Sequence, residues 1–311
     1  MRKCWDVVTV GEIYIDHVFS GLKNWSQPGE EVFTRNYLHE LGGGAAITAC
    51  GLGRLGRKTA IFGVVGEVEE AWVKQRLSDF HVDAGGLKQV KGSTGVTMSV
   101  SVMSERSFYS FAGSNQFLGD YLAGEGLTEQ LQKAAHVHFA APLDRRYAET
   151  VLPALKKAGC TVSLDVGWQP EWSAKPENLQ TCLDIDYFLP NRKEAERLTG
   201  KERSVEVLLG LEQLGFSHAV IKLGAQGAAI RTGGKMLRVP SPPVAVVDTT
   251  GAGDAFNAGL IDALLSGADA EEILRRAAAC GALSTRTAGA LNGLPTRQEL
   301  EESLWEIAKS R

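Results

Sequence analysis

Cysteine is scarce in this sequence, and its few cysteines stand far apart. Five cysteines are present, an odd number, and no two of them form a Cys-x-x-Cys pair. This spacing argues against a disulfide framework and against a cysteine-based zinc site. We therefore interpret them as reduced thiols in the protein core; they are Cys4, Cys50, Cys160, Cys182 and Cys280.

Long apolar runs and concentrated positive charge are also missing. No stretch approaches the roughly 18 consecutive apolar residues that a membrane-spanning helix needs, and charges interrupt the N-terminus before a signal-peptide segment could form. We expect a cytoplasmic protein without a membrane partner. The net charge is −4 and the basic residues are scattered, so there is no electrostatic reason to expect a nucleic-acid partner. A small-molecule ligand is favoured.

Glycine, by contrast, is plentiful. The chain has 35 glycines with 44% hydrophobic and 23% charged residues, which is typical of a globular protein with many tight turns. From Glu70 onward, apolar patterns alternate between helix and strand periodicity, which predicts a mainly parallel sheet. There is no internal repeat or low-complexity linker. We therefore predict a single doubly wound α/β domain over residues 1–311.

The most informative stretch is Val246–Gly259, VVDTTGAGDAFNAG. Its β-branched residues 246–247 predict a strand end, the small residues 251–253 a tight turn, and the apolar residues that follow a helix. Such a helix start binds anions, because its first N–H groups are unpaired and the positive end of the helix dipole faces the ligand. Phosphate is the ligand we expect. Asp254, in the first turn, has simple helix capping as its alternative role.

This stretch closely resembles the C-terminal signature of the ribokinase/PfkB family of carbohydrate kinases, Asp-Thr-Thr-Gly-Ala-Gly-Asp-x-Phe, present here as 248–256. The resemblance implies a ribokinase-like fold and transfer of the γ-phosphoryl group of ATP to a hydroxyl of a sugar or sugar derivative. In that family the turn amides hold the phosphoryl group and the final acid takes the proton of the acceptor hydroxyl. The corresponding residues here are Gly251, Ala252 and Gly253 for the amides and Asp254 for the acid.

Three residues are expected to contact the acceptor. A strand pattern over Asp6–Ile15 predicts that Asp16 stands at a strand end, where open α/β sheets gather their ligands. A solvent-facing strand end is the alternative, but the family has a sugar-binding Asp after a strand of this kind. Gly42 and Gly43 resemble the Gly-Gly of the family's N-terminal signature.

The chain departs from that N-terminal signature at one position. In the family the helix after Gly-Gly carries a sugar-binding Asn and ends in Arg-Leu-Gly, here residues 54–56. Counting back, the Asn position falls on Ile47. A hydrocarbon side chain cannot hydrogen-bond a hydroxyl, so the sequence argues against ribose as the preferred acceptor.

A dinucleotide-binding oxidoreductase is a rival interpretation, because residues 51–56 fit Gly-x-Gly-x-x-Gly. That fingerprint must follow a strand and open a helix. Here a helical pattern precedes it and a strand-like pattern, 59–65, follows it. The order is reversed, and we reject the interpretation.

Two segments, around residues 14–42 and 92–112, combine glycines with alternating strand patterns. The resemblance implies that they form a small β-lid inserted over the sugar. Closure of such a lid would exclude water from the reaction. Because family members often dimerise through the lid, we expect a homodimer.

The nucleotide site is expected from two further patterns. Asn191 and Glu194 form a helix capping box on sequence grounds alone. By resemblance, the family's Asn-x-x-Glu places the Asn near the nucleotide phosphates and the Glu in the hydration shell of Mg²⁺, which needs few carboxylates. Gly224 and Gly227 resemble the family's nucleotide-contacting Leu-Gly-x-x-Gly. Lys222 could reach a phosphate there, with a solvated lysine as the alternative.

Many family members also hold a monovalent cation such as K⁺ beside the signature. The resemblance would give that ion to Asp248 and Thr250, together with the loop at 285–290. Arg145 or Arg146, just after a predicted strand, is a hypothetical contact for an anionic acceptor, with a solvated helix start as the alternative. A nucleoside kinase and a catalytically silent sugar-binding regulator of the same fold remain alternative functions.

Overall fold

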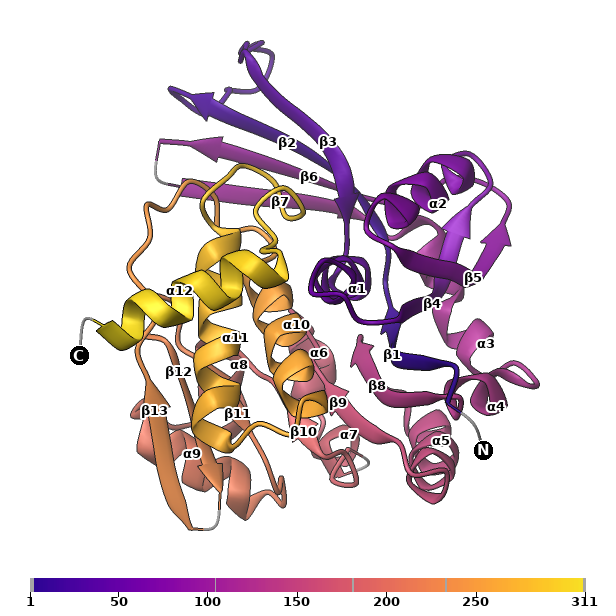
Figure 1. The fold of residues 1–311 in the computed structure, drawn as a ribbon. Coiled ribbons are helices and arrows are strands. Elements are labelled where there is room, and N and C mark those ends of the chain that lie inside the picture. Colours follow the sequence, from indigo (N-terminus) through magenta and orange to yellow (C-terminus); the bar gives the residue numbers. More distant parts are fainter. Residues whose placement is uncertain (1–2, 104, 181, 233, 310–311) are drawn as a thin grey trace.

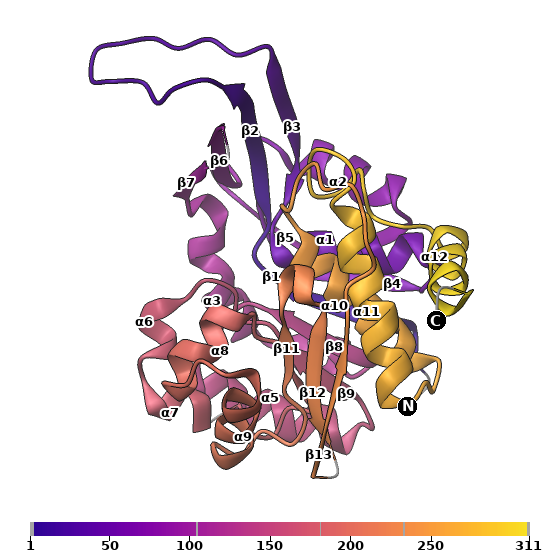
Figure 2. The same ribbon diagram turned by 90° about the vertical axis from the view of Figure 1, so that its left-hand side faces the viewer.

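The computed structural model describes residues 3–103, 105–180, 182–232 and 234–309. Its body is a six-stranded parallel sheet, in the order β10-β9-β8-β1-β4-β5, with helices on both faces (Figures 1 and 2). The strand order runs outward in both directions from β1 and β8, so the sheet is doubly wound. Its strands are β1 (Trp5–Gly11), β4 (Thr59–Gly66), β5 (Val82–Val90), β8 (Ala134–Ala140), β9 (Thr161–Leu164) and β10 (Tyr187–Phe188). The predicted fold class is confirmed.

The central strands are buried because helices cover both sides of the sheet. Every residue of β4 is buried, as is typical of parallel strands between two helical layers. The longer helices are α1 (Gly44–Arg54), α2 (Glu70–Asp79), α5 (Arg145–Lys157), α8 (Arg192–Thr199), α9 (Ser204–Gln213), α10 (Ala252–Leu265), α11 (Ala270–Ser284) and α12 (Arg297–Lys309). Shorter helical turns are α3 (Leu118–Leu122), α4 (Leu127–Leu131), α6 (Pro170–Ser173), α7 (Pro176–Gln180), η1 (Gly113–Phe117) and η2 (Gly224–Gln226). Among the described residues, no helix is long and apolar enough to cross a bilayer.

Helix α10 is held between α1 and α11, and its position depends on small residues. A Cβ at Gly51 of α1 would lie 2.8 Å from the Cβ of Ala258 of α10, and a Cβ at Gly259 would lie 2.7 Å from Cys280 Sγ of α11. Larger side chains would force the helices apart. The small-residue sequence of α10 therefore fixes where its N-terminus lies.

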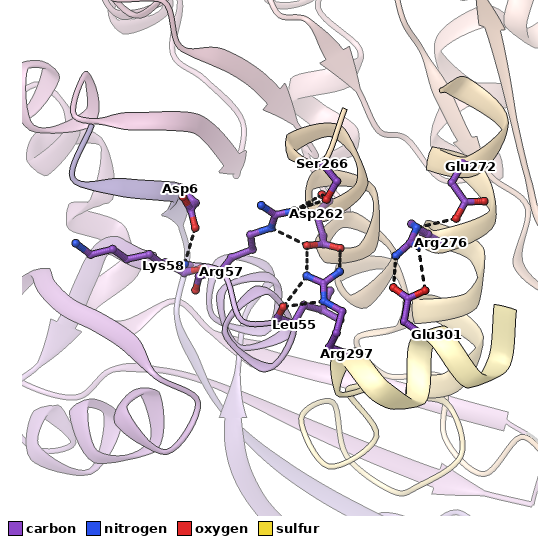
Figure 3. Close-up of polar contacts among 11 residues, drawn as sticks. Asp6, Leu55, Arg57, Lys58, Asp262, Ser266, Glu272, Arg276, Arg297 and Glu301 are labelled. Carbon is purple, nitrogen blue, oxygen red and sulfur yellow. Dashed lines mark hydrogen bonds and ion pairs between the residues drawn. The ribbon is translucent and has the colours of Figure 1, made fainter. Parts of the chain in front are cut away.

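The C-terminal half of α10 is anchored by a buried carboxylate, shown in Figure 3. The Asp262 side chain has no exposed surface and accepts hydrogen bonds from Arg57 Nε at 2.6 Å and Arg297 Nη1 at 2.5 Å. Arg297 also donates to the carbonyl oxygen of Leu55 at 2.6 Å. A buried carboxylate must be paired and hydrogen-bonded to be tolerated, and these two arginines tie α10 to the end of α1 and to α12.

A second sheet projects from the body (Figures 1 and 2). Its order is β3-β2-β6-β7, and it consists of β2 (Tyr14–Leu22), β3 (Asn36–Gly42), β6 (Gly95–Val102) and β7 (Glu105–Phe111). Side chains alternate across it: Asp16 and Val18 are buried, whereas Tyr37 and Tyr109 are more than half exposed. A third sheet joins β11 (Val220–Lys222), β12 (Ala228–Thr232) and β13 (Lys235–Val239).

Asp16 does not stand at the end of the first strand, so that prediction is wrong. Strand β1 ends at Gly11, and Asp16 is the third residue of β2, opposite Glu40 of β3. The chain turns between the two strands because Asn115 clamps Ile13, accepting from its amide at 3.0 Å and donating to its carbonyl oxygen at 2.8 Å. Asp16 therefore belongs to the projecting sheet.

The predicted strand at 246–247 is also absent. Val246 and Val247 are 61% and 63% exposed and lie in a segment without regular structure. The amides of Val247 and Asp248 both donate to a single carbonyl oxygen, that of Thr285, at 2.8 and 3.1 Å. The β propensity of these residues is overridden because no neighbouring strand is available to them.

Candidate active site

Helix α10 starts at the turn where the sequence predicts an anion-binding site. Gly251 is its N-cap, with φ of 72°, and a Cβ there would lie 2.7 Å from the Cβ of Ala290. Helix α10 begins at Ala252, earlier than the sequence pattern suggested. The Ala252 amide donates to Thr249 O at 3.3 Å, whereas the amides of Gly251 and Gly253 have no hydrogen-bond partner among the described residues. Two unpaired amides at the positive end of a 14-residue helix make an anion site.

Asp254 is half-buried in the first turn of α10 and faces the start of α1. Its Oδ1 lies 3.1 Å from the position that a Cβ on Gly44 would occupy. Burial raises the pKa of Asp254 to about 7, helped by the negative charges of Asp165 and Asp16. No described residue donates a hydrogen bond to its carboxylate. Asp254 is therefore not acting as a cap, and its pKa suits a general base near neutral pH.

A buried network lies next to Gly253. Lys222 Nζ forms an ion pair with Asp165 Oδ2 and lies 3.5 Å from Asn257 Oδ1, while Asn257 Nδ2 donates to Asp165 Oδ2 at 2.7 Å. A Cβ added to Gly253 would lie 3.5 Å from Lys222 Nζ. The lysine is thus neither solvated nor free: it brings a positive charge to the anion site and is held by Asp165.

Asp16 and Gly42 are in direct contact across the projecting sheet. A Cβ on Gly42 would lie 2.2 to 2.4 Å from the three carboxyl atoms of Asp16, so any larger residue at position 42 would displace this carboxylate. Burial raises the pKa of Asp16 to about 7, with further contributions from Glu40 and Asp248. Among the described residues, nothing donates a hydrogen bond to this carboxylate. Gly43, with φ of 91°, follows at the turn into α1.

The structure confirms the capping box at the start of α8. Asn191 N donates to Glu194 Oε2 at 2.8 Å, and Glu194 N donates to Asn191 Oδ1 at 3.0 Å. Glu194 is buried, and burial raises its pKa to about 7, together with the charge of Asp165. Capping therefore accounts for the hydrogen bonds of Glu194, while its burial brings it close to the charge of Asp165.

Two cavities meet at the start of α10. A pocket of about 500 Å³ is lined by Gly224, Gly227, Ala252 and Gly253, with Phe256 and small residues of α11. A larger cleft of about 1500 Å³ lies between the projecting sheet and the body. Both cavities are lined by Val246 and Thr249. Residues 246–259, the signature segment, therefore form the boundary between a compact, mostly apolar pocket and an open cleft.

The proposed cation residues are already engaged with an arginine. Asp248 is buried and Thr250 donates to it at 2.8 Å. Arg106 of β7 forms an ion pair with Asp248 Oδ1 at 2.8 Å and donates to Thr250 Oγ1 at 2.6 Å. Hydrogen bonds to the backbone and this arginine hold the pKa of Asp248 below its usual range despite burial.

Four residues of this site were missed by the sequence reasoning: Gly44, Arg106, Asp165 and Asn257. Gly44 extends a glycine cluster and Asn257 lies within the signature, so each had a local signal. Arg106 and Asp165 had none, because their contacts bridge 144 and 57 positions of the chain. Conversely, the exposed Arg145 forms an ion pair with Glu149 on the same helix, and neither it nor Arg146 lines the cleft.

Comparisons with known proteins agree with this geometry. The model of the pfkB family carbohydrate kinases matches residues 6–297. Haemophilus influenzae ribokinase is 30% identical over 98% of this chain and 99% of its own length, and Bacillus subtilis 2-dehydro-3-deoxygluconokinase is 29% identical over 96% and 95%. The structure of Arabidopsis thaliana ribokinase complexed with ribose and ATP superimposes with a TM-score of 0.84 at 27% identity, covering 98% of this chain and 99% of that one. The chain therefore belongs to the pfkB family of carbohydrate kinases, which are ATP-dependent phosphotransferases.

Proposed function

We propose that this kinase transfers the γ-phosphoryl group of ATP to a hydroxyl of a sugar or sugar derivative, with Asp254 as its general base. The observation that carries the proposal is the meeting of two cavities at the start of α10, one compact and one open. The compact pocket, with Gly224 and Gly227, suits an adenine nucleotide. The open cleft beneath the projecting sheet suits the acceptor. Asp254 and the free amides lie where the two ligands would meet.

The residues divide the chemistry between proton transfer and charge stabilisation. Asp254 removes the proton of the acceptor hydroxyl as its oxygen bonds to the γ-phosphorus and the bond to ADP breaks. The amides of Gly251 and Gly253 donate to the phosphoryl oxygens in transit, with the Ala252 amide completing the turn around them. Lys222 adds a positive charge beside them. Positioning and charge stabilisation supply most of the catalysis in phosphoryl transfer, so this set of groups is sufficient.

Mg²⁺ fits the acidic surroundings of the nucleotide phosphates. Burial, followed by the negative charge of Asp165, raises the pKa of both Glu194 and Asp254 to about 7, so a bound cation would favour their ionised forms. Among the described residues, no three His, Cys, Asp or Glu side chains are grouped to hold a metal directly. Mg²⁺ keeps most of its waters and binds phosphates, so Glu194 would hold it through water, with Asn191 fixing the Glu194 carboxylate. The bound ion would neutralise charge on the transferring phosphoryl group.

Two residues near the start of α10 and the projecting sheet bear on the acceptor. Asp16 has a carboxylate without a hydrogen-bond donor among the described residues, so it can accept from two neighbouring hydroxyls. Ile47 is buried, and its Cγ2 would lie 3.2 Å from a Cβ on Gly251, which supports an apolar side chain beside the proposed anion site. A ribose hydroxyl facing Ile47 would lose a partner at a cost of about 1 to 3 kcal/mol. We infer an acceptor that presents no hydroxyl there.

A coupled assay of ADP release tests this function. Ketoses, aldoses, deoxy-sugar acids, phosphosugars and nucleosides would each be offered with ATP and Mg²⁺, with Asp254→Asn as the blank. We expect turnover of at least one sugar or sugar acid and poor turnover of ribose at low millimolar concentration. Turnover of nucleosides alone would establish the nucleoside kinase instead. ATP binding without turnover of any acceptor would favour the silent regulator.

We also propose that the kinase forms a homodimer through the outer face of the projecting sheet. On the face of the sheet opposite Arg106, four large side chains are exposed: Tyr37, Met98, Tyr109 and Phe111 are 53%, 37%, 60% and 60% exposed. The same aromatic face on a second copy would cover it, because a symmetric dimer pairs identical patches. Light scattering of the wild type and of Tyr109→Asp would show a dimer and a monomer, respectively; a monomeric wild type would contradict the proposal.

A further inference from the structure

Arg106 is the one residue through which β7 of the projecting sheet forms an ion pair with the signature segment. Its Nη2 lies 2.8 Å from Asp248 Oδ1, and its Nη1 donates to Thr250 Oγ1 at 2.6 Å. The guanidinium is oriented from its own sheet, because Nε donates at 3.1 Å to the cross-strand neighbour Ser101. Only a quarter of the Arg106 side chain is exposed. These contacts make a defined site for a positive charge.

The Asp248 oxygen that faces Arg106 has no room left for another partner. Oδ1 accepts from the Thr250 amide at 2.9 Å and from Thr250 Oγ1 at 2.8 Å and forms the ion pair with Arg106, whereas Oδ2 accepts from the Gly289 amide at 3.0 Å. A carboxylate oxygen has about two lone-pair sites, and these three partners fill those of Oδ1. In the following loop, the Thr285 carbonyl oxygen already accepts two amides. Asp248 Oδ1 and Thr250 Oγ1, which the family resemblance gave to a monovalent cation, are therefore occupied.

We propose that the Arg106 guanidinium takes the place of the monovalent cation in this kinase. A K⁺ ion at Asp248 and Thr250 would compete with a guanidinium bound to the same two side chains and would be repelled by it. The arginine supplies the positive charge from within the chain and contacts Thr250, the residue before Gly251 of the anion site. Phosphoryl transfer by this enzyme is then independent of K⁺.

The same contact makes Arg106 a positioning residue that links the projecting sheet to the anion site. Thr250 and Gly251 are adjacent, so a movement of β7 that withdraws the guanidinium also removes the charge and the hydrogen bond that orient this turn. A diffusible cation would stay in place when the sheet moves. We therefore infer that the anion site is complete only when β7 lies against the signature segment.

Cation dependence tests this inference, which rests on the active site proposed above. The wild type and Arg106→Ala would be compared in KCl and in tetramethylammonium chloride at equal ionic strength. We expect the wild-type kcat and melting temperature to be the same in both salts. Arg106→Ala should lose about tenfold or more in kcat in tetramethylammonium, as expected for a lost charge-stabilising donor. K⁺ or low millimolar guanidinium should restore part of that loss and raise the melting temperature.

Arg203→Ala is the matched control, because the side chain of this arginine is 80% exposed and forms an ion pair with Glu206 on the surface. It should leave kcat and the salt response unchanged. The inference would be overturned if K⁺ raised the wild-type kcat severalfold or the wild-type melting temperature by several degrees. It would also be overturned if neither K⁺ nor guanidinium changed the kcat or melting temperature of Arg106→Ala. If Arg106→Ala does not fold, the wild-type titration alone decides. Melting needs no acceptor, so the result does not depend on the proposed sugar kinase activity.

Discussion

Lys222 and Asp165 form a buried ion pair against the first turn of α10, with Nζ 2.5 Å from Oδ2 and side chains only 11% and 9% exposed. Burial alone would lower the pKa of Lys222, but Asp165 and Glu194 raise it on balance, so the lysine stays charged. Asn257 donates to the same oxygen of Asp165. The ion pair thus keeps the positive charge of Lys222 beside the proposed phosphoryl position. Asp165 offsets the free-energy cost of burying that charge.

A double-mutant cycle measures this pair. Asp165→Asn should leave the buried charge of Lys222 without its partner and lower the free energy of unfolding by about 3 to 5 kcal/mol. Lys222→Met should cost a similar amount for the converse reason. The double variant should be more stable than the sum of the two losses predicts. Urea unfolding gives all four values; additive losses would mean that the two charges do not interact.

Replacement of Asp254 separates a catalytic role from a structural one. Asp254→Asn is nearly isosteric but cannot accept the proton of the attacking hydroxyl, so kcat should fall by about 10² to 10⁴ fold. Affinity for ATP and for the acceptor should change little, because neither ground-state complex needs the proton transfer. Steady-state rates and calorimetric binding would check both expectations. Near-normal kcat in Asp254→Asn would show that the general base is another group.

Asp254→Asn should also change how the stability of the protein depends on pH. Because burial raises the pKa of Asp254 to about 7, the folded protein binds this proton more tightly than the unfolded chain, whose value is about 4. The ionised carboxylate therefore destabilises the fold progressively as pH rises from about 4 to 7, and fully above that. Asp254→Asn removes this cost, so the variant should melt higher than the wild type at pH 8.

At pH 4.5 the two proteins should melt within about two degrees of each other, because Asp254 is protonated in the folded protein and the pH is less than one unit above its pKa in the unfolded chain, so most of the cost is absent. Scanning calorimetry at both pH values provides the comparison. An Asp254→Asn variant that melts lower than the wild type at pH 8 would indicate that Asp254 stabilises α10 as a cap. The pH profile of kcat in the wild type should fall below about pH 7 for the same reason.

Gly42→Ala should impair the acceptor side of the site selectively. The added Cβ would lie within 2.4 Å of the Asp16 carboxyl atoms and displace them. A lost hydrogen bond to a charged group is worth about 1.5 to 3 kcal/mol, so kcat/KM for the acceptor should fall by about 10-fold to 150-fold. The KM for ATP should stay unchanged. Gly119→Ala is the control, since its added Cβ would meet nothing within 4 Å. Equal losses of kcat/KM in both variants would show that Asp16 does not bind the acceptor.

The local sequence alone determined the alternating α/β architecture and the anion-binding helix start at residues 251–254. Both depend on interactions between near neighbours: periodic apolar side chains, a glycine that accepts the left-handed conformation, and unpaired amides of the first turn. The capping box at Asn191 and Glu194 was predictable for the same reason. The prediction of a strand at 246–247 was wrong because strands, unlike helices, need a partner from elsewhere in the chain.

Tertiary structure decided which side chains surround that helix start. Asp16 belongs to the projecting sheet through β2, because Asn115 turns the chain at Ile13. Lys222 forms a buried ion pair only because the end of β9 brings Asp165 next to it. Arg106 meets Asp248 only because β7 lies over the signature segment. Each contact joins residues that are far apart in sequence, and its energy depends on burial and on the spacing between elements, which no local pattern encodes.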